Sequence, residues 1–437
     1  MKQTASEWSL TELRATLAQG KITAQEAVRA CLDRIHAVDS ELHAFISVAH
    51  DNAMLAAEEM DTARAHGADC SGALWGVPIA IKDLVDVRGM RTTAASRVLD
   101  GEPVAASDAE CVRRLRAAGA IVIGKTNLHE FAYGGSGAIS AYGAVRNPLD
   151  HARVCGGSSS GSAAAVAAGM CLGALGTDTA GSVRLPAACC GVVGFKPTWG
   201  AVPVAGVIPL AWSYDHLGPL ARTVEDAGAL FAVLAGEPPQ WARPEGLRCG
   251  VAREYFCEDL APEVEAGFEA ALAAVRELGW ELIEVEMEIN EDRRASNAES
   301  WAFHEKWVAE RGALYDPGTL PRIVNGKKVR VEDYVEARRA LELLRERNRQ
   351  GVPNVDVVLT PTVPILPPTL GAFAEAGARG LELQMLRNTR PFNVLGWPTV
   401  SVPTARMVAV QVSAAWGQDW LALSAALELE KVLASKA

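Results

Sequence analysis

Short apolar runs bounded by glycine alternate with capped helices over the first 230 residues, and this alternation restricts the fold more than any other feature. The runs Gly76–Lys82 and Ala120–Ile123 have the length and composition of buried strands. Capping boxes at Ser9–Glu12, Thr23–Glu26 and Ser107–Glu110 predict three helix starts, because the hydroxyl and carboxylate satisfy free N–H groups of the first turn. The pattern predicts α/β layers with a sheet covered by helices on both faces.

The regular alternation of helices and short apolar strands ends at about residue 235. Strands are expected at Leu247–Ala252, Glu281–Met287, Val355–Thr360 and Thr399–Pro403, and a helix at Pro262–Leu278. Residues 291–350 are rich in charge and are predicted to be mostly helical. No repeat or low-complexity linker separates these parts, so we expect one continuous domain over residues 1–437.

Composition excludes several classes of protein. The 437 residues are 49% apolar, and their formal net charge of −11 is opposite to that of most proteins that grip nucleic acid. The N-terminus lacks the apolar segment of a signal peptide, and the run Ser162–Gly176 is too short for a membrane span. Nine scattered cysteines without a C-x-x-C pair indicate neither disulfides nor zinc. We expect a cytoplasmic protein without a nucleic-acid or membrane partner.

Two segments combine small residues with serines. Residues 156–162 form a glycine/serine turn that leads into an Ala-rich helix, and such a turn either caps a helix or exposes N–H groups to negative charge. In residues 176–186, small residues precede Ser182, which lets backbone N–H groups converge as an oxyanion hole requires. The alternative for this segment is an N-cap serine beside a surface pair of Asp178 and Arg184.

Lys82 ends an apolar strand. A lysine there either extends its amine to solvent or is buried with a lowered pKa.

Residues Gly119–Thr126 match the phosphate-loop pattern G-x-x-x-x-G-K-[ST], but the four intervening residues are apolar and strand-like, and a helix precedes them. We therefore expect no nucleotide there. The eight histidines form no ligand pattern, so no metal and no cofactor are expected.

Lys82, Ser158 and Ser182 together closely resemble the amidase signature family. Ser158 follows Lys82 by 76 residues and Ser182 follows Ser158 by 24, which fits that family. The resemblance is dense from about Leu74 to Ala227, thin from 235 to 350, and returns within residues 359–403. It implies one large α/β domain with a mixed central sheet, a core at about 74–227 and a variable C-terminal half at about 235–437.

The resemblance also assigns catalytic roles. Ser182 would be the acyl-forming nucleophile, Ser158 the bridging serine after a non-proline cis peptide, and Lys82 the base. Ser159, Asp178 and Arg184 would support these three residues. The oxyanion hole would consist of the backbone N–H groups of Thr179, Ala180, Gly181 and Ser182. Two positions often occupied by glycine in the family hold Ala180 and Ser160 here, and a positive φ at Ala180 would be costly.

Tyr133, Gly134, Gly135 and Trp212 lie where family members often line the substrate pocket. The expected substrate is a small neutral or aryl/alkyl amide, and relatives with the same machinery also cleave esters, ureas and carbamates (urethanes). A homodimer is left open.

Two alternatives stay open. One is the glutaminase subunit of a tRNA-dependent amidotransferase, whose members typically carry an R-I-x-x-G-T stretch and a Tyr-rich segment. Residues 320–326 read LPRIVNG here, without a Tyr-rich partner. The other is a catalytically inactive binding protein, which would have little reason to keep Lys82, Ser158 and Ser182 together.

Overall fold

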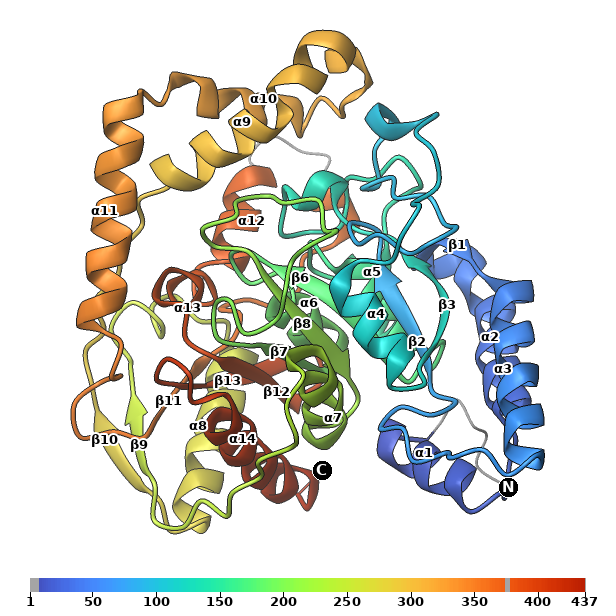
Figure 1. Ribbon diagram of the computed structural model, residues 1–437. Coiled ribbons are helices and arrows are strands. Elements are labelled where there is room, and N and C mark those ends of the chain that lie inside the picture. The colour runs from blue at the N-terminus through green and yellow to red at the C-terminus, as the bar shows by residue number, and fades with distance from the viewer. Residues whose placement is uncertain (1–7, 374–377, 437) are drawn as a thin grey trace.

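A mixed sheet of eleven strands runs through the computed structural model, which describes residues 8–373 and 378–436 (Figure 1). In sheet order the strands are β1 (Phe45–Val48), β3 (Ile121–Thr126), β2 (Pro78–Lys82), β6 (Gly173–Asp178), β8 (His216–Ala221), β7 (Val193–Lys196), β12 (Thr399–Ala405), β13 (Val408–Ala414), β11 (Val357–Pro361), β9 (Arg248–Val251) and β10 (Glu281–Glu284). Strand β2 is parallel to β3 and β6, and β9 is parallel to β10 and β11, whereas the other neighbours are antiparallel. A separate pair joins β4 (Arg146–Asn147) and β5 (Asp150–Val154).

Helices cover both faces of this sheet, as the sequence predicts. One face carries α5 (Ser160–Ala167) and α6 (Arg184–Cys190), and the other carries α4 (Glu110–Ala117), α7 (Val224–Ala235), α8 (Pro262–Glu277) and α14 (Asp419–Ala434). The β1 end is flanked by α2 (Ala24–Leu42) and α3 (His50–Ala65), and α1 (Leu10–Ala18) packs on α7. The chain is therefore a large single-domain α/β protein.

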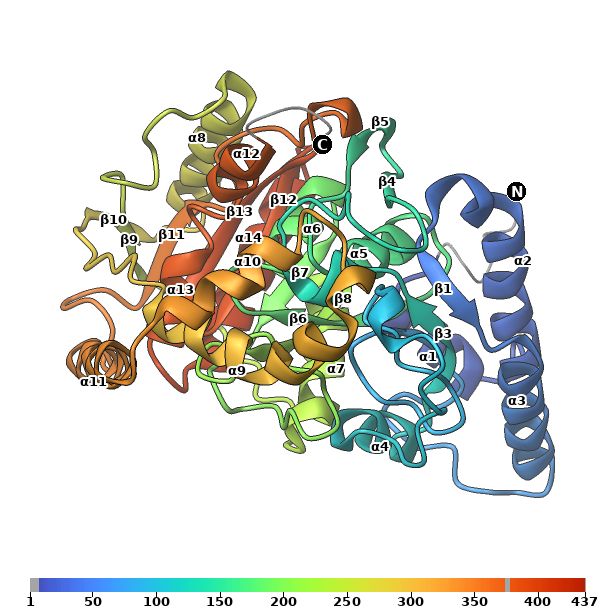
Figure 2. The same ribbon diagram turned by 90° about the horizontal axis from the view of Figure 1, so that it is seen from above.

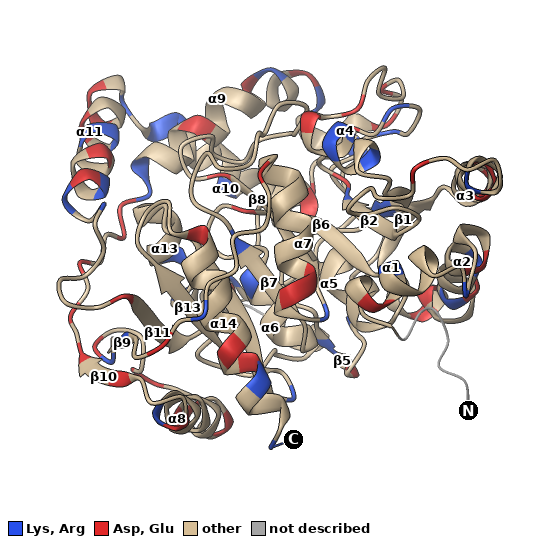
Figure 3. Cartoon of the chain, turned by 60° about the horizontal axis from the view of Figure 1, so that its bottom comes forward, with Lys and Arg blue, Asp and Glu red and all other residues tan. Residues whose placement is uncertain are grey.

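The charges of the chain gather on the peripheral helices, such as α2, α3, α8 and α11 (Val331–Arg347), whereas the strands are mostly free of them (Figure 3). Strands β2, β3, β6 and β8 are buried at every position. Their apolar runs are continuous because helices cover both faces of the sheet.

Helix starts test the capping predictions. The boxes at Ser9 and Thr23 are confirmed, since each hydroxyl accepts the N–H of the glutamate three residues on. The box at Ser107 is wrong. Helix α4 begins at Glu110, so the N-cap position falls on Ala109, whose side chain cannot accept a hydrogen bond.

In the C-terminal half, the predicted helix and strands all occur, although the strand expected at 281–287 ends at Glu284. Strand β13 was not predicted. Its burial at every position gives no alternation to recognise.

Two parallel strands end in charged residues at the same edge of the sheet. Lys82 is the last residue of β2 and Asp178 the last residue of its neighbour β6, so both lie at the same edge. Above this edge lies a helical layer made of α9 (Arg294–Arg311) and α10 (Leu320–Val324), which crosses the middle strands in the view from above (Figure 2). None of the helices in the described residues is long and apolar enough to cross a membrane.

Candidate active site

Lys82 lies fully buried at the edge of the sheet, with no exposed surface. Its Nζ lies 2.7 Å from Ser158 Oγ, 2.9 Å from Ser159 Oγ and 2.7 Å from Thr177 Oγ1. All three partners are neutral hydroxyls, and no carboxylate forms an ion pair with this lysine in the described part of the chain. The amine is therefore isolated from solvent and from direct charge neutralisation.

Burial lowers the pKa of Lys82 to about 7, because the desolvated ammonium loses its hydration. The negative charges of Asp178 and Asp215 oppose this shift without reversing it. A neutral amine has two N–H donors and one lone pair, so it can donate to two of the three hydroxyls and accept from the third. Ser159 uses its proton on the carbonyl of Thr177, 3.1 Å away, which leaves Ser158 and Thr177 as the hydroxyls able to donate to Lys82.

Ser158 sits in a glycine-rich loop that approaches other backbone closely. The Gly157–Ser158 peptide is cis, as the family resemblance implies. A Cβ at Gly157 would lie 2.8 Å from the nitrogen of Gly137, so only glycine fits. The N–H of His129 donates to the carbonyl of Ser158 at 3.1 Å. These contacts fix the hydroxyl of Ser158 beside Lys82.

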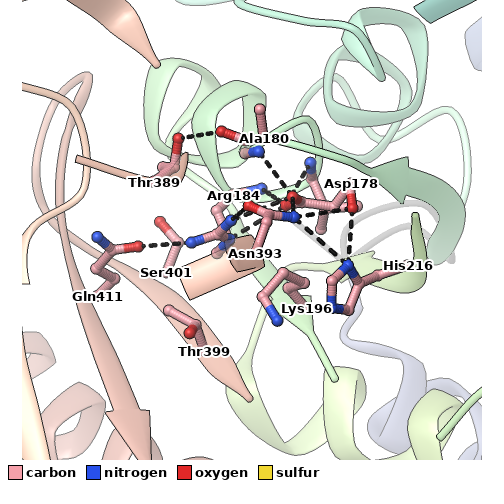
Figure 4. Close-up of polar contacts among 12 residues, drawn as sticks. Asp178, Ala180, Arg184, Lys196, His216, Thr389, Asn393, Thr399, Ser401 and Gln411 are labelled. Atoms are coloured by element: carbon pink, nitrogen blue, oxygen red, sulfur yellow. Dashed lines mark hydrogen bonds and ion pairs between the residues drawn. The ribbon is translucent and has the colours of Figure 1, made fainter. Parts of the chain in front are cut away.

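The loop that carries Ser182 is held by a buried ion pair (Figure 4). Asp178 and Arg184 are both buried, with 3.1 Å between Arg184 Nε and Asp178 Oδ2. The alternative prediction of a surface pair is therefore wrong, because neither side chain has any exposed surface. Arg184 also donates to Gln411 at 3.0 Å and Asn393 at 2.6 Å, and Asn393 donates back to Asp178 at 2.7 Å.

Burial alone would raise the pKa of Asp178, but Arg184, Lys196 and the amide of Asn393 hold it well below its usual range. The carboxylate also accepts the N–H of Gly181 at 2.7 Å and that of Val183 at 3.1 Å. It thus remains ionised and clamps the backbone on both sides of Ser182.

The backbone of this loop leaves some N–H groups free. Within the described residues, no acceptor takes the N–H groups of Ala180 and Ser182. The N–H of Gly181 points to Asp178, so the prediction that all four N–H groups from Thr179 to Ser182 face a ligand is wrong for Gly181. The positive φ falls on Gly181 (131°) and not on Ala180, so the alanine adds no strain of this kind. The carbonyl of Ala180 accepts the hydroxyl of Thr389 at 2.7 Å. The Ala180–Gly181 peptide group is therefore held on both sides, at its carbonyl by Thr389 and at its N–H by Asp178.

Ser182 opens into a pocket beneath the helical layer. The lining residues include Tyr133, Gly134, Thr179, Ala180, Ser182, Leu210, Tyr214, Arg293, Ser296, Asn297, Arg379, Leu386 and Arg390. Ser182 is 6% exposed, whereas Lys82 and Ser158 are fully buried behind it. Ser182 is joined to this pair through the backbone, since the N–H of Ser159 donates to the carbonyl of Ser182 at 3.2 Å. Within the described residues, no hydrogen bond joins the side chains of Ser182 and Ser158.

A second, mostly apolar chamber shares Ala132, Thr179 and Leu210 with this pocket. Trp212 lines the second chamber and is 43% exposed. Of the four predicted pocket residues, Tyr133 and Gly134 line the pocket beside Ser182, Trp212 lines its neighbour, and Gly135 packs against Leu386.

Several residues of the site carry no sequence signal that predicts their role. Thr177 lies within a segment that was singled out, but nothing local assigns a lysine partner to it. Asp215 accepts the hydroxyl of Thr179 at 2.6 Å, a contact across 36 residues. Arg293 and Arg390 line the pocket from the variable half, where the sequence carries no motif that could have found them.

The sequence model of the family described as Amidase matches residues 26–423. The chain is 36% identical to a glutamyl-tRNA(Gln) amidotransferase subunit of Maridesulfovibrio salexigens, over 91% of this chain and 90% of that protein. It superposes on the crystal structure of an amidase with a TM-score of 0.91 and 35% identity, covering 97% and 99% of the two chains. It superposes on the corresponding glutamyl-tRNA(Gln) amidotransferase subunit of Thermotoga maritima with a TM-score of 0.78 and 31% identity, covering 99% and 96%.

The buried ion pair makes a prediction for stability. Arg184→Met leaves the Asp178 carboxylate buried without its cation, so we expect it to lower the free energy of unfolding by about 3–5 kcal/mol. Urea denaturation followed by circular dichroism measures this loss. Arg113→Met is the matched control, because Arg113 pairs with Glu110 on the exposed side of α4, and its midpoint should stay unchanged. Equal shifts for the two variants would contradict the role assigned to the buried pair.

Proposed function

This chain belongs to the amidase family, whose enzymes act on carbon–nitrogen bonds, and on that premise we propose that it hydrolyses a small-molecule amide through an acyl-enzyme on Ser182. One observation carries the proposal. A lysine with a pKa of about 7 lies buried 2.7 Å from the hydroxyl of Ser158, and the next residue, Ser159, donates its N–H to the carbonyl of Ser182, which lines a pocket. An inactive binding protein would gain nothing from isolating an amine in this way.

In the acylation step, Ser182 Oγ attacks the carbonyl carbon of the amide. Its proton passes to Ser158, whose own proton passes to the neutral amine of Lys82. The free N–H groups of Ala180 and Ser182 donate to the carbonyl oxygen as negative charge develops on it. The carbon–nitrogen bond then breaks while Lys82, through Ser158, returns the proton to the leaving nitrogen.

Deacylation repeats the path with water. Water attacks the acyl carbon, its proton passes through Ser158 to Lys82, and the proton returns to Ser182 Oγ as the ester bond breaks. The sum is amide plus water giving carboxylic acid plus amine, and the three side chains end as they began. Histidine is not needed, because burial supplies the lysine with a pKa suited to a base near neutral pH.

The second chamber supports a substrate with an apolar part. Val204, Val207, Ile208, Pro209 and Trp212 line it, next to the shared wall at Thr179. This lining suits the aryl or alkyl group predicted from the sequence. Esters and carbamates with such groups are further candidates, since the same nucleophile can attack their carbonyl carbons.

A second candidate is the glutaminase reaction of an amidotransferase, because the curated relative from Maridesulfovibrio salexigens bears that enzyme's name. Release of ammonia from glutamine would use the same acylation step. The R-I dipeptide of the expected motif, Arg322–Ile323, lies in α10, where Arg322 pairs with Glu382 at 2.7 Å. Arg322 is thus engaged with the protein's own carboxylate, and this contact does not by itself distinguish the two functions.

The base assignment predicts a pH dependence. Lys82 works only when deprotonated, so kcat/KM should rise about tenfold per pH unit below 7 and level off above it. Lys82→Arg keeps the positive charge but cannot lose a proton in this range, so it should lower the rate by about 10²–10⁴ or more. A folded Lys82→Arg enzyme within tenfold of wild type, with the same pH profile, would show that another group activates the serine.

The nucleophile assignment predicts covalent labelling. A fluorophosphonate probe should modify Ser182 and abolish activity, and Ser182→Ala should be neither labelled nor active. Peptide mass spectrometry locates the adduct. Ser160→Ala is the matched control, since the Ser160 hydroxyl is buried without a partner in the described residues and touches no reacting atom. An adduct on another residue, with Ser182 unmodified and activity lost, would refute the assignment.

The two candidate functions differ in substrate and partner. The chain purified alone should hydrolyse members of a panel of simple amides, p-nitroanilides and aryl carbamates at least about tenfold more efficiently, by kcat/KM, than glutamine. Preferential turnover of glutamine, increased by proteins that copurify from the native host, would instead establish the amidotransferase function.

A further inference from the structure

The pocket beside Ser182 is lined by arginines, and no acidic side chain is among its described lining residues. These arginines are Arg293, Arg379 and Arg390. Its remaining polar lining is neutral, from Tyr133, Tyr214, Ser296 and Asn297 among others.

Two of these arginines have no carboxylate partner within the described residues. Arg390 donates to two backbone carbonyls, that of Asn290 at 2.7 Å and that of Asp292 at 2.7 Å. These bonds place the chain so that Arg293 enters the same pocket. Over residues 8–373 and 378–436, the Arg293 guanidinium has neither an ion pair nor a hydrogen-bond acceptor.

The positive charge of the third arginine, Arg379, is balanced by a carboxylate of the protein. Arg379 donates to Glu382 at 3.0 Å, and Arg322 donates to the same carboxylate at 2.7 Å. Glu382 is buried and also accepts the hydroxyl of Ser136 at 2.7 Å. Its charge is thus already shared between two cations and does not neutralise Arg293.

The electrostatics of Arg293 and Arg390, which both lack a carboxylate partner in the described residues, agree with this geometry. Burial lowers the pKa of Arg293, the charge of Arg379 lowers it further, and the opposing charges of Glu291 and Tyr255 do not reverse the shift. Burial likewise lowers the pKa of Arg390, and the charge of Arg293 adds to that effect. Arg293 also precedes α9, whose N-terminal dipole is positive on the same side. An anion in the pocket would relieve this repulsion.

We propose that the pocket binds a carboxylate carried by the substrate, with Arg293 and Arg390 as its recognition pair. This inference rests on the proposed function, because it concerns the pocket of the same nucleophile. Two guanidinium groups can each present paired N–H donors to a carboxylate, a geometry that a lysine ammonium does not offer. The substrate is then an amide with an acid group, in place of the neutral amide expected from the sequence.

The same lining disfavours an α-amino acid. Glutamine carries an ammonium beside its carboxylate, and the described lining offers no carboxylate to pair with it. The favoured substrates are monoamides of dicarboxylic acids, in which a carboxylate and an amide are joined by a chain without an amino group.

The test compares matched amides. Succinamate, glutaramate and adipamate differ from butyramide, pentanamide and hexanamide by a terminal carboxylate in place of a methyl group. For the best chain length, wild-type kcat/KM should favour the acid by about 10- to 100-fold, mainly through KM. Arg293→Gln should reduce this preference to near unity, and Arg293→Lys should restore only part of it. Arg113→Gln, an exposed arginine on α4, removes the same charge and should leave the preference unchanged.

A binding measurement separates this proposal from the catalytic one. Succinate, glutarate and adipate are titrated calorimetrically into Ser182→Ala, with and without Arg293→Gln. Binding that depends on Arg293 supports the carboxylate site even if no amide is turned over, in which case the proposed function fails alone. Hydrolysis through Ser182 with equal efficiency for acids and neutral amides overturns the carboxylate site and leaves the proposed function intact. Absence of dicarboxylate binding, or binding insensitive to Arg293, also overturns it.

Discussion

The carboxylate of Asp178 is the point on which the site depends. It lies at the end of β6, accepts the N–H groups of Gly181 and Val183, and pairs with Arg184 away from solvent. A buried carboxylate is stable only when cations and donors compensate its lost hydration. Arg184 and Asn393 supply them, and Asn393 comes from the other half of the chain. The loop that carries Ser182 is therefore shaped by a contact that needs the whole sheet to be assembled.

Two buried lysines on adjacent strands show how the same residue type receives different tasks. Lys125 on β3 lies 2.6 Å from the carboxylate of Asp83, which neutralises it directly. Lys82 on β2 meets three hydroxyls instead, and the carboxylates of Asp178 and Asp215 act on it only from a distance. Desolvation then outweighs attraction, and the pKa of Lys82 falls to about 7. The exchange of a carboxylate partner for hydroxyls is thus what allows burial to lower the pKa of Lys82.

The two halves of the chain contribute different residues to the site. The parallel strands β2 and β6 hold Lys82 and the turn before Ser182 at one edge of the sheet, and the loop between β5 and α5 brings Ser158 to Lys82. The pocket above them is completed by residues near α9, α12 (Ala378–Met385) and α13 (Arg390–Leu395). The pocket therefore draws on both halves: Tyr133, Gly134 and Tyr214 come from the dense part of the family resemblance, and Arg293 and Arg390 come from the C-terminal half. Members of one family can differ in substrate while the reaction stays the same.

The sequence by itself determined the layered α/β fold and the capped helices at Ser9 and Thr23, because periodicity and capping patterns are local properties of the chain. The grouping of Lys82, Ser158 and Ser182 came from the family resemblance and stays a prediction for Ser182, although Lys82 does bond to Ser158. It could not place Asp178 and Arg184 inside, since an acidic and a basic residue close together in the sequence are equally compatible with a surface pair until the assembled sheet buries them. It also could not find Thr177 as a lysine partner or Arg293 and Arg390 in the pocket. Those roles depend on which side chains face one another across long stretches of the chain, and on how much water the assembled layers exclude, so only the tertiary structure decided them.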